Sequence, residues 1–179
     1  MKKKVIIVGA GGHGRVVADA LLLSGAHEVA GFVDDQLAAG TIVIGDLKVL
    51  ASSKAIDVIK REANAFVIAI GNNELRKKFF EQFSAFLEPA SVIHPAASVS
   101  AFAKVGEGSQ VLAGAVLGAN AVIGRNCIIN ALSLVDHDSV VGDHVHVAQG
   151  ALIGGGCKVE AGATIAQGQS ISSYSTKTS

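Results

Sequence analysis

Residues 111–141 form the stretch "VLAGAVLGANAVIGRNCIINALSLVDHDSVV", which repeats one pattern every six residues. An aliphatic residue returns at each sixth position, and the residue four places after it is usually small. The register extends in both directions, and its aliphatic positions are Ile93, Val99, Val105, Val111, Leu117, Ile123, Ile129, Val135, Val141, Val147, Ile153, Val159, Ile165 and Ile171. A period of six fits neither a helix nor an ordinary alternating strand, and it is typical of hexapeptide β-helices. We therefore predict an all-β parallel β-helix over residues 91–171.

The repeat also predicts the inside of this solenoid. Each hexapeptide makes one short strand and one corner, and three hexapeptides close a coil, so residues about 18 apart stack on each other. The aliphatic residue points inward, the small residue fits beside it, and the glycine that often follows the aliphatic residue eases the turn. Cys127 and Cys157 hold the small inward position. We therefore expect both cysteines to be core residues rather than metal ligands.

The first half of the chain has a different pattern. Between Lys4 and Ala90, short apolar strands at 4–10, 27–35 and 64–73 alternate with helical segments at 14–25 and 73–86. Strands that alternate with helices predict a parallel sheet, here a small Rossmann-like α/β domain over residues 1–90. After Ile171 the hexapeptide pattern dissolves into "SSYSTKTS", so residues 172–179 are expected to form a frayed tail.

Composition excludes several classes of function. The chain has 179 residues, with 15 basic and 15 acidic side chains, so no net field attracts nucleic acid. No apolar run approaches the roughly 20 residues of a membrane span. The basic start "MKKKVIIVGAGG" breaks into glycine too soon for a signal peptide, and this predicts a cytoplasmic protein.

A glycine-rich loop follows the first predicted strand. Gly9, Gly11 and Gly14 fit the pattern G-x-G-x-x-G, and Asp34 stands twenty residues after Gly14. The pattern suggests a dinucleotide, but too few residues remain before the solenoid for a second nucleotide-binding half. Its mechanics also suit a smaller ligand, because glycines let the backbone approach phosphates at a helix N-terminus. A structural turn beside a solvated acidic loop is the alternative.

The solenoid carries an acidic–histidine–acidic cluster. Asp136, His137 and Asp138 follow the inward Val135, so they fall at an outward corner. The residues 18 positions away from His137 are Ala119 and Gly155, and this leaves room for a ligand. A neutral histidine beside a carboxylate is suited to act as a general base. Two alternatives are a metal site, because three histidines and three aspartates lie within residues 136–146, and a solvated repeat face.

His146 lies nine residues after His137, which is half a coil. Because a coil edge is roughly 15 Å long, one subunit cannot bring both histidines to one substrate. A trimer packed about the solenoid axis would bring His137 of one chain near His146 of its neighbour. The same spacing weakens a metal site, and we expect no bound metal.

These motifs resemble one known family. "VGAGGHG", "FVDD" and "DHDSVVGDHVHVAQGA" resemble the two-domain left-handed β-helix sugar acetyltransferases, which include UDP-4-amino-sugar N-acetyltransferases and sialic acid O-acetyltransferases. The resemblance implies acetyl-coenzyme A as a co-substrate, no permanently bound cofactor, and a homotrimer with sites between subunits. It implies a catalytic His137 oriented by Asp138. It also assigns residues to the nucleotide-activated amino sugar (Gly11, Gly12, His13, Asp34, Asp35, Asn130 and Asp136) and to acetyl-coenzyme A (His146 and Gly155).

The expected reaction is transfer of an acetyl group to the 4-amino group of a UDP-linked 4-amino-6-deoxy sugar, for surface glycan biosynthesis. Two alternatives stay open. One is O-acetylation of a sialic acid. The other is a catalytically impaired subunit that binds a nucleotide sugar but has a shortened coenzyme A site, because family members usually continue the hexapeptides for another coil.

Overall fold

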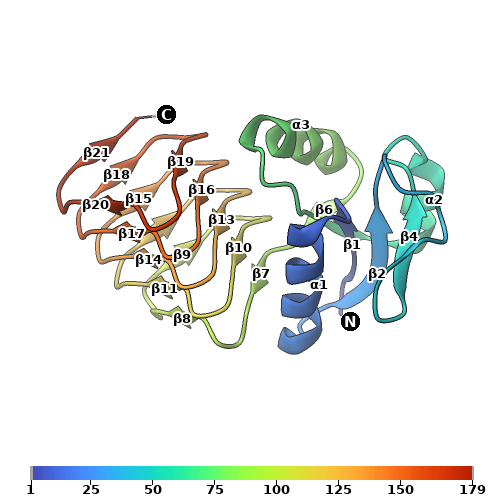
Figure 1. Cartoon of the computed structure of the whole chain (residues 1–179), viewed down its shortest axis with the longest axis horizontal. Helices are drawn as coiled ribbons and strands as arrows, with labels where there is room; N and C mark the ends of the chain where they lie inside the picture. Colours follow the sequence, from blue (N-terminus) through green and yellow to red (C-terminus); the bar gives the residue numbers. More distant parts are fainter. Residues whose placement is uncertain (1, 179) are drawn as a thin grey trace. The chain divides into compact units, whose positions relative to one another are not determined.

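The chain folds into two compact units, Met1–Ala90 and Ser91–Ser179, in a computed structural model that describes residues 2–178 (Figure 1). The first unit contains six strands and three helices within the described residues. The elements are β1 (Lys4–Val8), α1 (Gly12–Ser24), β2 (Glu28–Val33), β3 (Ile42–Ile44), β4 (Leu47–Ala51), α2 (Ile56–Glu62), β5 (Ala65–Ile68), α3 (Asn73–Ser84) and β6 (Glu88–Pro89).

The strands of the first unit form one sheet in the order β3-β4-β2-β1-β5-β6. All neighbours are parallel except β3, which pairs with β4 in an antiparallel hairpin. The predicted Rossmann-like parallel sheet is confirmed. The β3–β4 hairpin and α2 fall in a segment for which the sequence patterns made no prediction.

Helices cover both faces of this sheet. Ile6 and Val8 of β1 pack in one cluster with Ile59 of α2 and Phe83 of α3. The alternate residues of β1 point to the other face. There Gly14 of α1 lies against Phe32, the sheet partner of Ile7. The sheet is therefore doubly wound, and the loops after its strands collect at one edge.

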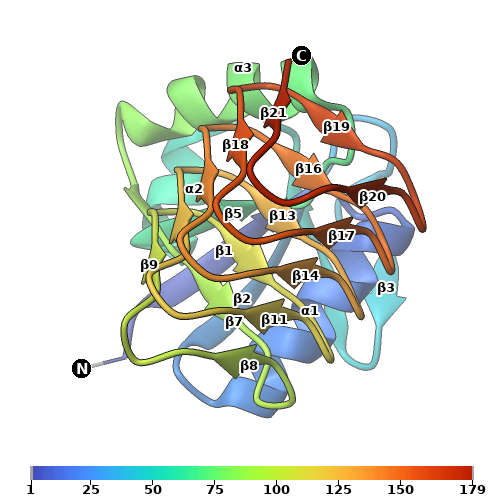
Figure 2. The same ribbon diagram turned by 90° about the vertical axis from the view of Figure 1, so that its left-hand side faces the viewer.

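The second unit is a parallel β-helix. Its strands are all two residues long: β7 (Val92–Ile93), β8 (Ser98–Val99), β9 (Lys104–Val105), β10 (Gln110–Val111), β11 (Val116–Leu117), β12 (Val122–Ile123), β13 (Ile128–Ile129), β14 (Leu134–Val135), β15 (Val140–Val141), β16 (His146–Val147), β17 (Leu152–Ile153), β18 (Lys158–Val159), β19 (Thr164–Ile165), β20 (Ser170–Ile171) and β21 (Thr176–Lys177). They stack into three five-stranded parallel sheets (Figures 1 and 2). Every pairing joins residues 18 apart, such as Leu117 with Val135, as the period predicts.

The inward aliphatic residues from Val99 to Ile171 form one continuous core, whereas Ile93 in the first coil is exposed. The cluster runs from Val111 to Ile165, and its members are almost completely buried. Cys127 and Cys157 belong to it as free thiols, so their prediction as core residues is confirmed.

The corners differ from the prediction in how they use glycine. The glycines directly after the inward residues, such as Gly118, do not adopt positive φ. A Cβ on Gly118 would instead lie 2.6 Å from the backbone nitrogen of His137 in the next coil, so glycine is needed there for close approach. From the corner after β9 onward the third residue is left-handed, and at six corners it is not glycine: Asn120, Asn126, Leu132, Asp138, His144 and Tyr174.

The coils continue past the point where the aliphatic pattern ends. The predicted frayed tail was wrong for residues 172–178, because β21 pairs with β18 and Tyr174 donates its backbone N–H to the Gly155 carbonyl. Strand pairing uses backbone groups, so it persists where side chains turn polar. Residue 179 lies outside the described residues. Between residues 2 and 178, no helix combines the length and apolar character needed to cross a bilayer.

Candidate active site

A cavity of roughly 610 Å³ opens at the carboxyl edge of the sheet in the first unit. Its walls come from the segments that follow β1, β2 and β5. In the strand order, β1 lies between β2 and β5. From β1 the chain adds strands first on the β2 side of the sheet and later on the β5 side, so the cavity lies where the order of strands reverses. Doubly wound folds bind their ligands at this place.

The glycines of the loop divide into two groups. A Cβ on Gly14 would lie 2.1 Å from the Gly9 carbonyl oxygen, and Gly9 itself has a φ of 105° and lies against the Ala69 carbonyl. These two glycines allow the helix and strands to pack. A Cβ added to Gly11 or Gly12 would meet nothing within 4 Å, and both glycines line the cavity together with His13. Because α1 begins at Gly12, its first N–H groups lie at the cavity, where an anion is favoured.

The two aspartates line the cavity, and both are held by the protein. Asp34 accepts a hydrogen bond from the Ala10 N–H at 2.8 Å, which ties the glycine loop to the end of β2. Asp35 accepts from the Ser53 N–H and from the Ser53 hydroxyl, each at 2.7 Å. Their carboxylates are therefore fixed in place. Asp34 Oδ1 already accepts the backbone N–H groups of Gln36 and Leu37, whereas Asp34 Oδ2 and both oxygens of Asp35 keep acceptor capacity for a ligand.

Several cavity residues were missed by sequence reasoning. Ser53 follows β4, while Ile70, Leu75, Lys78 and Phe79 come from the β5–α3 loop and α3. That loop is fixed by the fully buried Arg76, which donates to the carbonyls of Ile70 and Gly71 at 3.2 Å. No motif marks these residues. The residues from the β5–α3 loop and α3 have one sequence signal, their place at or after the end of the predicted strand 64–73, and Ser53 has none.

The second cluster of functional side chains is the corner formed by Asp136, His137 and Asp138, which we call the His137 corner. It follows β14 and is solvent-exposed at His137 and Asp138, as predicted. His137 Nδ1 lies 2.8 Å from Asp138 Oδ2, so the Nδ1–H donates to the carboxylate and leaves the Nε2 lone pair free to accept a proton. Asp136 accepts the backbone N–H of His137 at 2.7 Å.

The neighbouring coil explains the position of the His137 imidazole. The ring lies over Gly155, where an added Cβ would be 2.5 Å from Nε2. The Gly156 N–H donates to the His137 carbonyl at 2.8 Å and locks the two coils together. Gly155 was predicted to bind acetyl-coenzyme A, and in the structure it makes room for the imidazole.

The charges of this corner favour protonation of His137. The hydrogen bond to Asp138 and, next, the charge of Asp136 raise the pKa of His137 above its ordinary value. The same hydrogen bond from His137, followed by one from the Asn120 amide, lowers the pKa of Asp138. A histidine poised in this way can accept a proton near neutral pH, while Asp138 stays ionised.

The other histidines lie at different places in the coil. His146 is in β16, and its Nε2 lies 3.3 Å from the Asn130 amide nitrogen. Asn130 is almost completely buried at the corner after β13. The structure thus places Asn130 beside His146 and not in the His137 corner.

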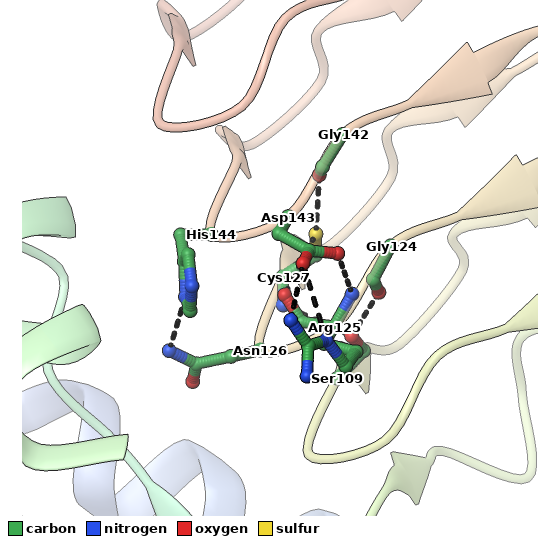
Figure 3. A network of polar contacts seen from close by, with 8 residues as sticks. All are labelled: Ser109, Gly124, Arg125, Asn126, Cys127, Gly142, Asp143 and His144. Atoms are coloured by element: carbon green, nitrogen blue, oxygen red, sulfur yellow. Dashed lines mark hydrogen bonds and ion pairs between the residues drawn. The ribbon is translucent and has the colours of Figure 1, made fainter. Parts of the chain in front are cut away.

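A third corner carries a polar network (Figure 3). Arg125 forms a two-point ion pair with Asp143 one coil further on, and the Asn126 amide lies 2.9 Å from Nδ1 of His144. These contacts join consecutive coils. His144 lies at the corner after β15, which is a different corner from that of His137. Across residues 2–178 the structure brings together no group of three His, Cys, Asp or Glu side chains suited to a metal ion.

Both units match families of known proteins. Residues 4–83 match the PglD N-terminal domain family, and residues 102–137 and 120–155 match the bacterial transferase hexapeptide family. No curated protein matches the chain.

Three solved structures are similar over nearly the whole chain. The acetyltransferase domain of PglB from Neisseria gonorrhoeae is 29% identical, with a TM-score of 0.80 over 99% of this chain and 89% of that one. Its complex with acetyl coenzyme A is 28% identical, with a TM-score of 0.82 over 100% and 97%. A histidine-to-asparagine mutant of perosamine N-acetyltransferase from Caulobacter crescentus, in complex with CoA and GDP-perosamine, is 27% identical, with a TM-score of 0.80 over 97% and 90%. The second unit is thus a left-handed β-helix of the acetyltransferase kind.

Proposed function

The chain belongs to the hexapeptide-repeat sugar acetyltransferase family, and on that premise we propose that it acetylates the 4-amino group of a UDP-linked 4-amino-6-deoxy sugar. Acetyl-coenzyme A is the donor, and the product serves surface glycan biosynthesis. The observation that carries the proposal is the His137–Asp138 pair, which leaves the Nε2 lone pair available while the imidazole rests against the bare backbone of Gly155.

His137 supplies the one proton acceptor that the reaction needs. As the sugar nitrogen attacks the thioester carbonyl, a C–N bond forms, the C–S bond breaks, and the nitrogen must lose a proton. Nε2 of His137 takes that proton, and the leaving thiolate of coenzyme A later receives one. Asp138 holds the neutral imidazole in the required tautomer and stabilises the imidazolium that forms. Asp136 adds a second negative charge beside it.

The cavity of the first unit holds the nucleotide in this proposal. Gly11, Gly12 and His13 surround the diphosphate at the start of α1, and Asp34 and Asp35 accept hydrogen bonds from the ribose and base. The perosamine enzyme was crystallised with a GDP-sugar, so UDP- and GDP-sugars must be compared directly. A built nucleotide cavity favours this acceptor over a free sialic acid, which has no need of one.

We further propose that the active protein is a homotrimer with sites between subunits. In each site His137 of one subunit faces His146 and Asn130 of its neighbour, with His146 helping to position the acetyl donor. An outward apolar row on the sheet of β14 supports self-association. Its members Val116, Leu134 and Leu152 stack directly on one another, and Val116 and Leu152 are 37% and 44% exposed.

The test of function is a comparison of wild type and His137→Ala. Loss of a positioned base should lower kcat by roughly 10²–10⁴-fold. UDP-sugar affinity, measured by isothermal titration, should stay nearly the same, because the proposed nucleotide cavity is in the other unit. An unchanged kcat would overturn the assignment of His137. Titration with UDP-sugar, GDP-sugar and sialic acid in turn identifies the acceptor.

A further inference from the structure

Asn120 contacts the acidic partner of His137 from the neighbouring coil. It is the last residue of the corner after β11, one coil before Asp138. Its Nδ2 donates to Asp138 Oδ1 at 3.0 Å, while Asp138 Oδ2 accepts from His137 Nδ1 at 2.8 Å. One carboxylate is thus held at both oxygens, by an amide on one side and by the imidazole on the other.

The backbone alone does not explain an asparagine here. Asn120 and Asp138 both have φ near 60°, the left-handed conformation that glycine, asparagine and aspartate tolerate best. Gly156, one coil further along the same column of corners, has the same conformation with φ 65°. Glycine would therefore satisfy the turn at position 120. The amide contributes something that the turn does not need.

We infer that Asn120 is a positioning residue for acetyl transfer, fixing the Asp138 carboxylate so that His137 presents Nε2 to the reacting amine. This inference rests on the proposed function. Its physical basis is exposure, because the Asp138 side chain is 58% exposed and has several staggered rotamers open to water. Two-point anchoring removes that freedom before the substrate arrives.

The charged groups around His137 make the inference measurable. Asp136 and Asp138 face the ring from its own corner. The corner of the preceding coil contributes Asn120 to this environment. The corner of the following coil contains only glycines, and Tyr174 lies one coil beyond it. A change at position 120 therefore reaches His137 through Asp138.

The experiment is an NMR titration of the His137 imidazole in three full-length proteins. Asn120→Gly keeps the turn and releases Asp138, so the His137 pKa should fall toward its ordinary value as their hydrogen bond becomes less populated. Asn120→Asp also suits the turn but adds a negative charge beside Asp138, so the His137 pKa should rise. Opposite shifts support the inference. Unchanged values, or shifts in the same direction, would overturn it.

Kinetics then connect the titration to catalysis. Asn120→Gly should lower kcat/KM by roughly 10-fold, which is the effect of one hydrogen bond to a charged group. The acid limb of the pH profile of kcat/KM should move in the same direction as the His137 pKa measured by NMR. In an Asp138→Asn background the same change should have little further effect. His137→Ala, measured in parallel, separates the two claims. If it stays active, the proposed function fails; if it is inactive while Asn120→Gly matches wild type, only the role of Asn120 fails.

Discussion

Gly155→Ala tests whether the space beside His137 matters for catalysis. The new methyl carbon would stand 2.5 Å from Nε2 and 2.7 Å from Cε1 of the imidazole, well inside the 3.4 Å at which ordinary contact begins. The Gly155 backbone cannot easily retreat, because its carbonyl accepts the Tyr174 N–H at 2.9 Å and the next N–H is bonded to the His137 carbonyl. The ring must therefore move.

The size of the effect follows from that displacement. A shift of about 1 Å in a catalytic group costs on the order of 10²-fold in rate, which corresponds to about 2.7 kcal/mol. The free energy of unfolding should fall by only about 1 kcal/mol or less, because the half-exposed imidazole can rotate into water. This is the low end of the range for an overpacked site. We thus expect a large loss of kcat with a nearly unchanged melting temperature.

Steady-state acetylation kinetics, combined with a double-mutant cycle, check this reasoning. If Gly155→Ala acts only by displacing His137, it should add almost nothing in a His137→Ala background. A raised KM for acetyl-coenzyme A with unchanged kcat would refute it. That result would mean that Gly155 contacts the donor, as the family resemblance implies.

Protonation of His137, anchoring of Asp35 and the site shared between subunits can each be tested separately. The kcat/KM of wild type should fall as pH drops through the His137 pKa, which the Asp138 hydrogen bond and the Asp136 charge raise above its ordinary value. Asp138→Asn should move this limb to lower pH, and a limb that does not move would contradict the ion pair. Ser53→Ala should weaken UDP-sugar binding about 5-fold in isothermal titration by releasing one oxygen of Asp35, whereas Ser53→Thr should not, and equal affinities would argue against an ordered Asp35. Mixed trimers of His137→Ala and His146→Ala subunits, dissociated and reassembled, should recover activity that neither parent has; mixtures as inactive as the parents would exclude a shared site.

The solenoid was predictable because its period repeats one physical requirement many times. Each inward aliphatic residue must fill the same narrow interior, so the register from Ile93 to Ile171 defines the coils without further information. The end of the fold was not predictable in this way. Backbone pairing carries β21 past the last aliphatic residue, and backbone hydrogen bonds leave no pattern in side chains.

The site was predictable only where spacing could be applied. Stacking at 18 residues places Gly155 against His137, and the structure agrees. The same spacing places Asn120 against Asp138. In the first unit, Ser53 and Phe79 reach the cavity from segments with no motif, and their contacts depend on how the chain crosses the sheet. The β3–β4 hairpin did leave a signal, since two apolar runs flank Gly45, where φ is 52°.

Acetyl transfer by this protein can be measured directly. Wild-type protein is incubated with acetyl-coenzyme A and either a UDP-linked 4-amino-6-deoxy sugar, its GDP counterpart or a sialic acid, and release of the coenzyme A thiol is followed together with the product mass. We predict rapid thiol release with the UDP-sugar, one added acetyl group on its nitrogen, and loss of both signals in His137→Ala. Acetylation of the sialic acid in preference to the UDP-sugar, or UDP-sugar turnover that His137→Ala leaves intact, would contradict the account.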